Sequence, residues 1–248
     1  MFKRVTTWPE DFNVHATIQR LYDERIKNYT AGEGLDMATM ESLAFASLLR
    51  EGFEVRLSGQ DVERGTFSHR HAVLSDQKID REKFTFLKTI NPKTTICNSH
   101  LSEFGVMGFE YGYSITNPNT LIIWEAQFGD FANVAQIMID NFVVSGEAKW
   151  GLQSSLVLNL PHGMDGQGPE HSSARLERFL QLCDDSSDIE ISKLSAEERV
   201  RNTNIQVAYC STSANYFHIL RRQLRRDFRK PLVLMISKKL LKLKSVIH

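Results

Sequence analysis

The chain has 248 residues, 42% of them hydrophobic, so it is long enough to fold around a sizeable core. Its 30 basic and 30 acidic side chains balance, which argues against a protein whose main partner is the nucleic-acid backbone or an anionic membrane surface. No apolar run approaches the roughly 20 residues of a membrane-spanning helix, and the first residues show no evident targeting peptide.

The chain is expected to open with two amphipathic helices. Apolar residues repeat at helical spacing over 14–26, and Asp36 is placed to cap a second helix that continues to residue 48. Short apolar runs then alternate with helical patterns, which predicts one doubly wound, mostly parallel α/β sheet with helices on both faces. The strands are expected at 53–57, 94–97, 120–124, 155–160, 206–209 and 231–236, and the later helices at 102–114, 131–142, 174–183 and 214–228.

Two stretches interrupt the alternation. Residues 59–88 are charged and rich in histidine and arginine, and we expect them to form a functional loop. Residues 184–204 carry little apolar content and are predicted to be a solvated excursion.

The candidate functional residues follow the strands, because ligands of a parallel sheet bind beyond the carboxyl ends of its strands. Four polar loops are predicted to meet at that edge. Their chemically informative residues are Gln60, Asp61, Arg64, His69, Arg70 and His71 after the first strand; Glu103 after the second; Glu125, Gln127, Phe128, Asp130 and Phe131 after the third; and His162, Glu170 and His171 after the fourth.

Several of these features also have a purely structural interpretation. A carboxylate such as Glu103 is favoured in the first turn of any helix by the helix dipole. His69 and His71 resemble half of a zinc site that His162 or His171 would complete, but alternating histidines in a charged loop are more often solvated, and no metal site is predicted. The three cysteines lack CxxC spacing, which favours a reducing compartment.

The basic segment that contains Arg221, Arg222, Arg225 and Arg226 has helical spacing. We interpret it as a solvated or interface face of a helix and predict no nucleic-acid binding there.

Taken together, several blocks resemble the 2-oxoglutarate dehydrogenase family, the thiamine-dependent first component of the complex that decarboxylates 2-oxoglutarate. The similarity runs in order from about residue 35 to residue 241. The blocks include SGQDVERGTFSHRHAV, NSHLSEFGVMGFEYGYS, WEAQFGDFANVAQIMIDNF, LPHGMDGQGPEHSSARLERFLQLC and FHILRRQLRRDFRKPLV.

The resemblance implies a transketolase-like pyrimidine-binding domain and thiamine diphosphate as its cofactor. Glu103 matches the family's glutamate that hydrogen-bonds the cofactor's aminopyrimidine, and a partly desolvated site would raise its pKa. Phe131, with Phe128 nearby, matches the aromatic residue that packs against the pyrimidine ring. Gln127 matches a polar contact, and His171 matches an active-site histidine suited to proton transfer.

The resemblance also implies the domain organisation and the partners. Residues 1–34 would be a helical lead-in, 35–241 the pyrimidine-binding domain and 242–248 a tail. Gln60, Asp61 and His71 would belong to a loop near the site. Mg²⁺ and the diphosphate would be held by a second domain that has no counterpart in this sequence. The expected partners are a 2-oxo acid substrate, the dihydrolipoyl succinyltransferase component, and either a second copy of the chain or a diphosphate-binding chain.

Three alternatives remain open from the sequence. The chain is either half of an enzyme active site or a non-catalytic interaction module, such as a truncated paralogue, that binds a complete homologue. A 2-oxoadipate dehydrogenase fragment is the neighbouring possibility for the substrate. The family works in the mitochondrial matrix of eukaryotes and in the cytoplasm of bacteria, and we expect the matrix.

Overall fold

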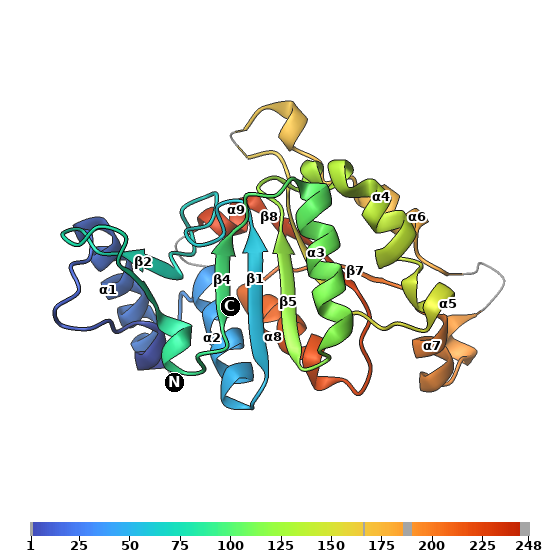
Figure 1. The fold of residues 1–248 in the computed structure, drawn as a ribbon, viewed down its shortest axis with the longest axis horizontal. Helices are drawn as coiled ribbons and strands as arrows, with labels where there is room; N and C mark the ends of the chain where they lie inside the picture. The colour runs from blue at the N-terminus through green and yellow to red at the C-terminus, as the bar shows by residue number, and fades with distance from the viewer. Residues whose placement is uncertain (1, 166, 186–189, 244–248) are drawn as a thin grey trace.

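A computed structural model describes residues 2–165, 167–185 and 190–243 of the chain. Its centre is a six-stranded, all-parallel sheet in the order β4-β1-β5-β6-β8-β7 (Figure 1). The strands of this sheet are β1 (Glu54–Gly59), β4 (Thr95–Asn98), β5 (Thr120–Glu125), β6 (Val157–His162), β7 (Gln206–Tyr209) and β8 (Leu232–Ser237). The predicted fold class and all six predicted strands are therefore confirmed.

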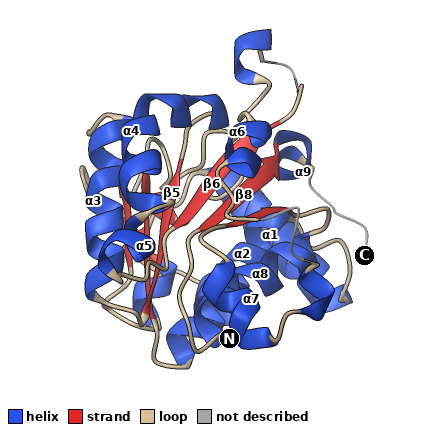
Figure 2. Ribbon diagram, turned by 90° about the vertical axis from the view of Figure 1, so that its right-hand side faces the viewer, coloured by secondary structure: helices blue, strands red, loops and turns tan. Residues whose placement is uncertain are grey.

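Helices cover both faces of the sheet, as Figure 2 shows, with α3 and α4 on one side and α2 and α8 on the other. The helices are α1 (Ala16–Ala31), α2 (Met37–Arg50), α3 (Glu103–Thr116), α4 (Gln136–Met138), α5 (Gly146–Trp150), α6 (Leu176–Gln181), α7 (Ala196–Asn202), α8 (Ser213–Arg225) and α9 (Lys238–Lys242). Shorter 3₁₀ segments are η1 (Phe2–Val5), η2 (Phe86–Thr89), η3 (Gly129–Ala135), η5 (Pro169–His171) and η6 (Ile191–Lys193), and η4 (Ile139–Val143) is a π-helical turn.

The helix boundaries have local causes. Asp36 caps α2 as predicted, since its Oδ1 accepts from the backbone N–H of Thr39 at 2.6 Å. The helix predicted at 174–183 begins only at residue 176, because Arg175 has a left-handed backbone with φ of 56°.

The segment predicted as one helix over 131–142 is helical but irregular. It passes from 3₁₀ (η3) through a single α turn (α4) to the π turn η4, where the N–H of Val144 bonds the carbonyl of Ile139 at 3.0 Å. The interruption at 59–88 contains a small antiparallel pair, β2 (Val73–Ser75) and β3 (Lys83–Thr85), that the sequence did not predict. In the excursion at 184–204, α7 has a capping box formed by Ser195 and Glu198.

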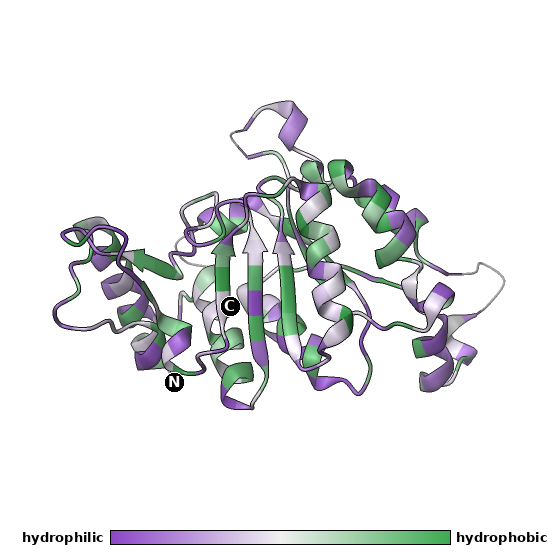
Figure 3. Cartoon of the chain, in the orientation of Figure 1, coloured by the Kyte–Doolittle hydropathy of each residue, from purple (hydrophilic) through white to green (hydrophobic). Residues whose placement is uncertain are grey.

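Two apolar cores fill the space between the sheet and its helices. Val55, Leu57 and Leu121 face the core under α2 and α8, whereas Ile122 and Trp124 face the one under α3. This alternation follows from the two-residue period of a strand. Figure 3 shows β4 and β5 as mostly hydrophobic, β1 as a mixture of hydrophobic and hydrophilic residues, and the outlying helix α7 as mostly hydrophilic. No helix within the described ranges is long and apolar enough to cross a bilayer.

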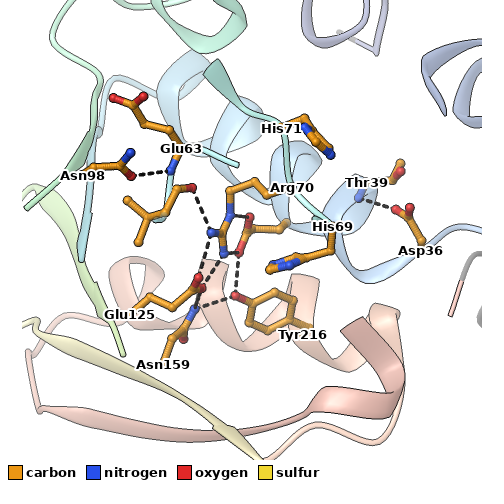
Figure 4. A network of polar contacts seen from close by, with 12 residues as sticks. Asp36, Thr39, Glu63, His69, Arg70, His71, Asn98, Glu125, Asn159 and Tyr216 are labelled. Atoms are coloured by element: carbon orange, nitrogen blue, oxygen red, sulfur yellow. Dashed lines mark hydrogen bonds and ion pairs between the residues drawn. The ribbon is translucent and has the colours of Figure 1, made fainter. Parts of the chain in front are cut away.

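A buried polar network joins the elements at the carboxyl edge of the sheet (Figure 4). The guanidinium of Arg70 is 1% exposed and lies between two carboxylates. It binds Glu41 of α2 at 2.6 and 3.0 Å and Glu125 at the end of β5 at 2.8 Å, with a second, shorter contact to Glu125. Arg70 also donates to the carbonyl of Val62 at 3.1 Å. One cation thus fixes the loop after β1 against α2 and β5.

Two neutral side chains complete this network. The hydroxyl of Tyr216 in α8 donates to Glu41 at 2.8 Å, and the amide of Asn159 in β6 donates to that hydroxyl, also at 2.8 Å. Burial, together with the negative charge of Glu41, raises the pKa of Tyr216 well above its ordinary value. The phenol therefore remains a neutral donor beside carboxylates that share a single guanidinium.

Replacement of Arg70 by alanine is expected to lower the free energy of unfolding by about 3–5 kcal/mol, because it leaves Glu41 and Glu125 buried without their cation. Urea denaturation measures the change. Arg81→Ala is the matched control, since the Arg81 side chain is 92% exposed, and it should leave the midpoint unchanged. Equal midpoints for both variants would contradict a supporting role for the network.

Candidate functional site

The carboxyl edge of the sheet brings the loops after β1, β5 and β6 together. Gly59 is paired in register with Glu125, and Glu125 with Asn159. Gly59 has φ of 149°, and a Cβ atom there would lie 2.1 Å from the Glu125 carbonyl oxygen. Only glycine therefore lets β1 and β5 approach so closely at their ends.

An aromatic cluster lies just beyond this edge. The ring of His171 stacks on Phe128, with centroids 4.3 Å apart and planes inclined by 15°, and meets Phe131 edge-on at 5.2 Å. Phe128 and Phe131 are perpendicular at 5.8 Å. Phe67, from the loop after β1, meets Phe128 edge-on at 6.0 Å. Residues from three loops thus form one cluster, and all four rings are half-buried.

Charged side chains surround the His171 ring and its backbone. The Nδ1 atom of His171 lies 3.2 Å from an oxygen of Asp130, which is buried. The ammonium of Lys238, the first residue of α9, donates to the His171 carbonyl at 2.6 Å and lies 5.7 Å from the centre of the Phe128 ring. The segment that directly follows β8 therefore also contributes to the site.

Glu103 is the first residue of α3, as the sequence predicted. Ser102 caps the helix, its Oγ accepting from the N–H of Gly105 at 3.4 Å. Glu103 and Gln127 are both half-buried. Within residues 2–165, 167–185 and 190–243, no hydrogen bond or ion pair engages the carboxylate of Glu103 or the side-chain amide of Gln127. Both groups are therefore available to a ligand, and within the same ranges no hydrogen bond or ion pair links either of them to the aromatic cluster.

The loop after β1 carries the three other predicted site residues. Gln60 is half-buried, Asp61 is paired with Arg64, and the Nε2 atom of His71 contacts the carbonyl of Ser68 at 3.0 Å. Asp61, Ser68 and His71 have φ angles of 61°, 55° and 51°. Such left-handed backbone is strained for residues other than glycine, and clusters of it are typical of functional loops.

The histidines considered as zinc ligands lie in different environments. His69 is buried, and both of its ring nitrogens lack a hydrogen-bond partner among the described residues. His162 accepts from the N–H of Ala174 at 3.0 Å through Nδ1, and burial lowers its pKa. The described part of the chain holds no group of three or more His, Cys, Asp or Glu side chains arranged for a metal ion.

Two residues of the site, Phe67 and Lys238, were not predicted as site residues, and Asp130 was predicted to lie at this edge without an assigned role. Phe67 stands in the charged loop after β1 and Asp130 among the polar residues after β5, but the sequence gives no sign that Phe67 contacts Phe128 or that Asp130 contacts His171. Lys238 follows directly on β8, so the strand-end rule that identified the other loops would have found it if it had been applied to the last strand.

Comparison with known proteins identifies the family of this domain. Residues 33–244 match the family model described as the pyrimidine-binding domain of transketolase. The chain is 56% identical over 243 residues to the mitochondrial 2-oxoglutarate dehydrogenase of Saccharomyces cerevisiae and 52% identical over 243 residues to that of Schizosaccharomyces pombe. It is 55% identical over 248 residues to the 2-oxoglutarate dehydrogenase E1 component of Brucella ovis.

These alignments cover the chain almost completely but only part of each relative. They include 97% of the chain for the two yeast proteins and 99% for the bacterial one. The chain spans 24%, 24% and 23% of the length of those relatives. The similarity is therefore to one region of a much longer protein.

The ring of His69, buried and without a hydrogen-bond partner in the described ranges, predicts a dependence of stability on pH. Burial is the main reason that its pKa lies well below the ordinary 6.5. Between that lowered pKa and 6.5 the unfolded chain binds more protons than the folded one, so stability falls as the pH drops below about 6.5, by up to about 1.4 kcal/mol per pH unit.

The variant His69→Leu should lose this contribution and retain stability better between pH 6.5 and 5, as measured by urea denaturation at each pH. His100→Leu, a change at an exposed position, is the control and should follow the wild-type curve. If His69→Leu also follows the wild-type curve, the folded protein does not hold His69 neutral.

Proposed function

The chain belongs to the transketolase pyrimidine-binding domain family. On that premise we propose that it is the corresponding region of a 2-oxoglutarate dehydrogenase and supplies the pyrimidine-binding half of a thiamine diphosphate-dependent active site. The proposed activity is oxidative decarboxylation of 2-oxoglutarate with transfer of the succinyl group. The observation that carries the proposal is the convergence of Phe128, Phe131 and His171 beyond the carboxyl edge of the sheet.

The residues at this edge fit an aminopyrimidine. Half-buried aromatic rings offer it a flat apolar face, and Glu103 offers a carboxylate that no side chain of the described residues engages. When bound, thiamine diphosphate supplies the reactive carbon that attacks the 2-oxo group. We assign Glu103 to the hydrogen bond with the pyrimidine nitrogen, Phe131 and Phe128 to orientation of its ring, and Gln127 to a polar contact.

His171 is proposed to transfer a proton to or from the bound substrate. Its ring lies at the open edge of the sheet and is 23% exposed, and an imidazole exchanges protons readily near neutral pH. Gln60, Asp61 and His71 are proposed to border the site from the loop after β1, whose Phe67 contacts Phe128.

The other half of the site is assigned to a diphosphate-binding domain. We propose that this domain holds the diphosphate and Mg²⁺ and contributes the selection of 2-oxoglutarate over 2-oxoadipate. The domain division 1–34, 35–241 and 242–248, the dihydrolipoyl succinyltransferase component as a partner, and a location in the mitochondrial matrix, or the cytoplasm of a bacterium, remain proposals that follow from the family.

The outer face of α3 is the proposed contact with a second subunit. Four large apolar side chains on or just before this helix are exposed: Leu101, Phe104, Phe109 and Tyr113. A Cβ atom at Gly112 would meet nothing within 4 Å, so a second backbone has room to approach here. Glu103 lies at the amino-terminal end of this exposed apolar face. Such a face is suited to an active site that is shared between subunits.

The proposed activity is tested by 2-oxoglutarate-dependent reduction of an electron acceptor, with thiamine diphosphate and Mg²⁺. The purified chain alone should be inactive, and addition of a diphosphate-binding domain from a relative should produce activity. With that domain present, Glu103→Gln should lower the rate by about 100-fold or more while the circular dichroism spectrum is unchanged. Glu33→Gln, at an exposed position, should keep the wild-type rate.

The other results are equally informative. Activity of the chain alone would refute the assignment of half a site. Inactivity with the added domain, despite a stable complex, would favour a non-catalytic interaction module.

Replacement of Phe109 by glutamate should weaken self-association, because it places a charge in the apolar face proposed to be buried between subunits. Analytical ultracentrifugation should show at least about a tenfold increase in the dissociation constant. Ile79→Glu is the control: Ile79 is 52% exposed, close to the 53% of Phe109, but lies between β2 and β3. Equal effects of both changes would place the contact elsewhere.

A further inference from the structure

The ring of His171 is held in one orientation by contacts on several sides. Phe128 stacks on its face at 4.3 Å and Phe131 meets it edge-on at 5.2 Å. The carbonyl of the same residue accepts from Lys238, whose side chain is fully buried. The two aromatic contacts restrict rotation of the ring, so each of its two nitrogens has a defined surrounding.

The two nitrogens of this ring face different partners. Nδ1 lies 3.2 and 3.3 Å from the two oxygens of Asp130, whose carboxylate is largely buried. Nε2 lies 3.8 Å from the carboxylate of Glu170, which is beyond hydrogen-bonding distance, and the Glu170 side chain is 66% exposed. A carboxylate only accepts hydrogen bonds, so the short contact places the proton of a neutral His171 ring on Nδ1.

Asp130 is itself fixed in place. Its backbone carbonyl accepts from the guanidinium of Arg175 at 3.2 Å, and Gly129 before it is wedged so tightly that a Cβ atom would lie 2.5 Å from the Pro161 carbonyl oxygen. The charge of Asp130 also reaches Lys238: burial lowers the pKa of that ammonium, and Asp130 opposes the shift. Asp130 is therefore a rigid acceptor rather than a mobile surface carboxylate.

We propose that Asp130 is a positioning residue that holds His171 as the Nδ1–H tautomer, so that Nε2 is presented unprotonated, as a hydrogen-bond acceptor for a donor group of the ligand bound at this edge. Phe128 and Phe131 pack against the ring in this orientation, and Lys238 binds the backbone carbonyl of the same residue. The part of this inference that concerns catalysis rests on the function proposed above. The part that concerns the tautomer is a property of the chain alone.

The test is long-range ¹H–¹⁵N NMR of the ring nitrogens in the histidine-labelled chain, without thiamine diphosphate, at a pH where the ring is neutral. The His171 signals are identified by their loss in His171→Gln. The wild type should show the Nδ1–H form in at least about a tenfold excess, as expected for a hydrogen bond to a charged acceptor. A wild type that is mainly Nε2–H would overturn the proposal and requires no variant.

Two variants of Asp130 then assign the effect to that carboxylate. Asp130→Ala removes the acceptor and should shift the population to Nε2–H. Asp130→Asn keeps the shape of the side chain and provides the test if the alanine variant does not fold. It should raise the Nε2–H fraction, because an amide can also donate to Nδ1. Glu170→Gln, the matched control, should leave the tautomer unchanged.

An unchanged tautomer in the folded Asp130 variants, or a shift in Glu170→Gln of the same size, would overturn the assignment. A separate titration with thiamine diphosphate and a diphosphate-binding domain distinguishes the two proposals. If the cofactor does not bind but the NMR result holds, the proposed function fails and the role of Asp130 in fixing the tautomer stands.

Discussion

The arrangement of the candidate site depends on one buried cation. The guanidinium of Arg70 binds the carboxylates of Glu41 and Glu125, and Tyr216 and Asn159 extend the network to α8 and β6. Each carboxylate has lost most of its contact with water, which is unfavourable unless a cation and hydrogen bonds replace the water. The fold is therefore constrained to keep α2, β5 and the loop after β1 in one fixed relation.

The fixed arrangement of α2, β5 and the loop after β1 also determines where the neighbouring site residues lie. Glu125 ends β5, and Gln127 and Phe128 follow within three residues, while Phe67 lies three residues before Arg70. The ion pair between Arg70 and Glu125 therefore lies within three residues of both rings and holds the contact between Phe67 and Phe128 in place. A rigid network beneath a half-exposed aromatic cluster is an arrangement that keeps a binding surface in shape before its ligand arrives.

The elements that could be predicted from the sequence were those with strong local signals. Apolar runs located all six central strands, and the rule that ligands lie beyond strand ends placed Phe128, Phe131 and His171 in one group from the sequence alone. The Arg70 network could not be predicted, because its partners lie 29 and 55 residues away in the chain and Arg70 stands in a loop of charged residues. The irregular helix at 129–143 also depends on packing, and the roles of Glu103 and Gln127 remain predictions because they concern a ligand.

The position of β8 in the sheet has a consequence for how the chain folds. This strand lies between β6 and β7, although it is the last of the six to be synthesised, and the hydrogen bond from Tyr216 to Glu41 joins residues 175 positions apart. The central sheet cannot be completed, and Glu41 cannot bind the hydroxyl of Tyr216, until nearly all of residues 2–243 have left the ribosome. Contacts of such long sequence separation slow folding and leave unpaired strand edges exposed meanwhile. Synthesis of this region therefore leaves a long interval in which a chaperone would have an exposed sheet edge to protect.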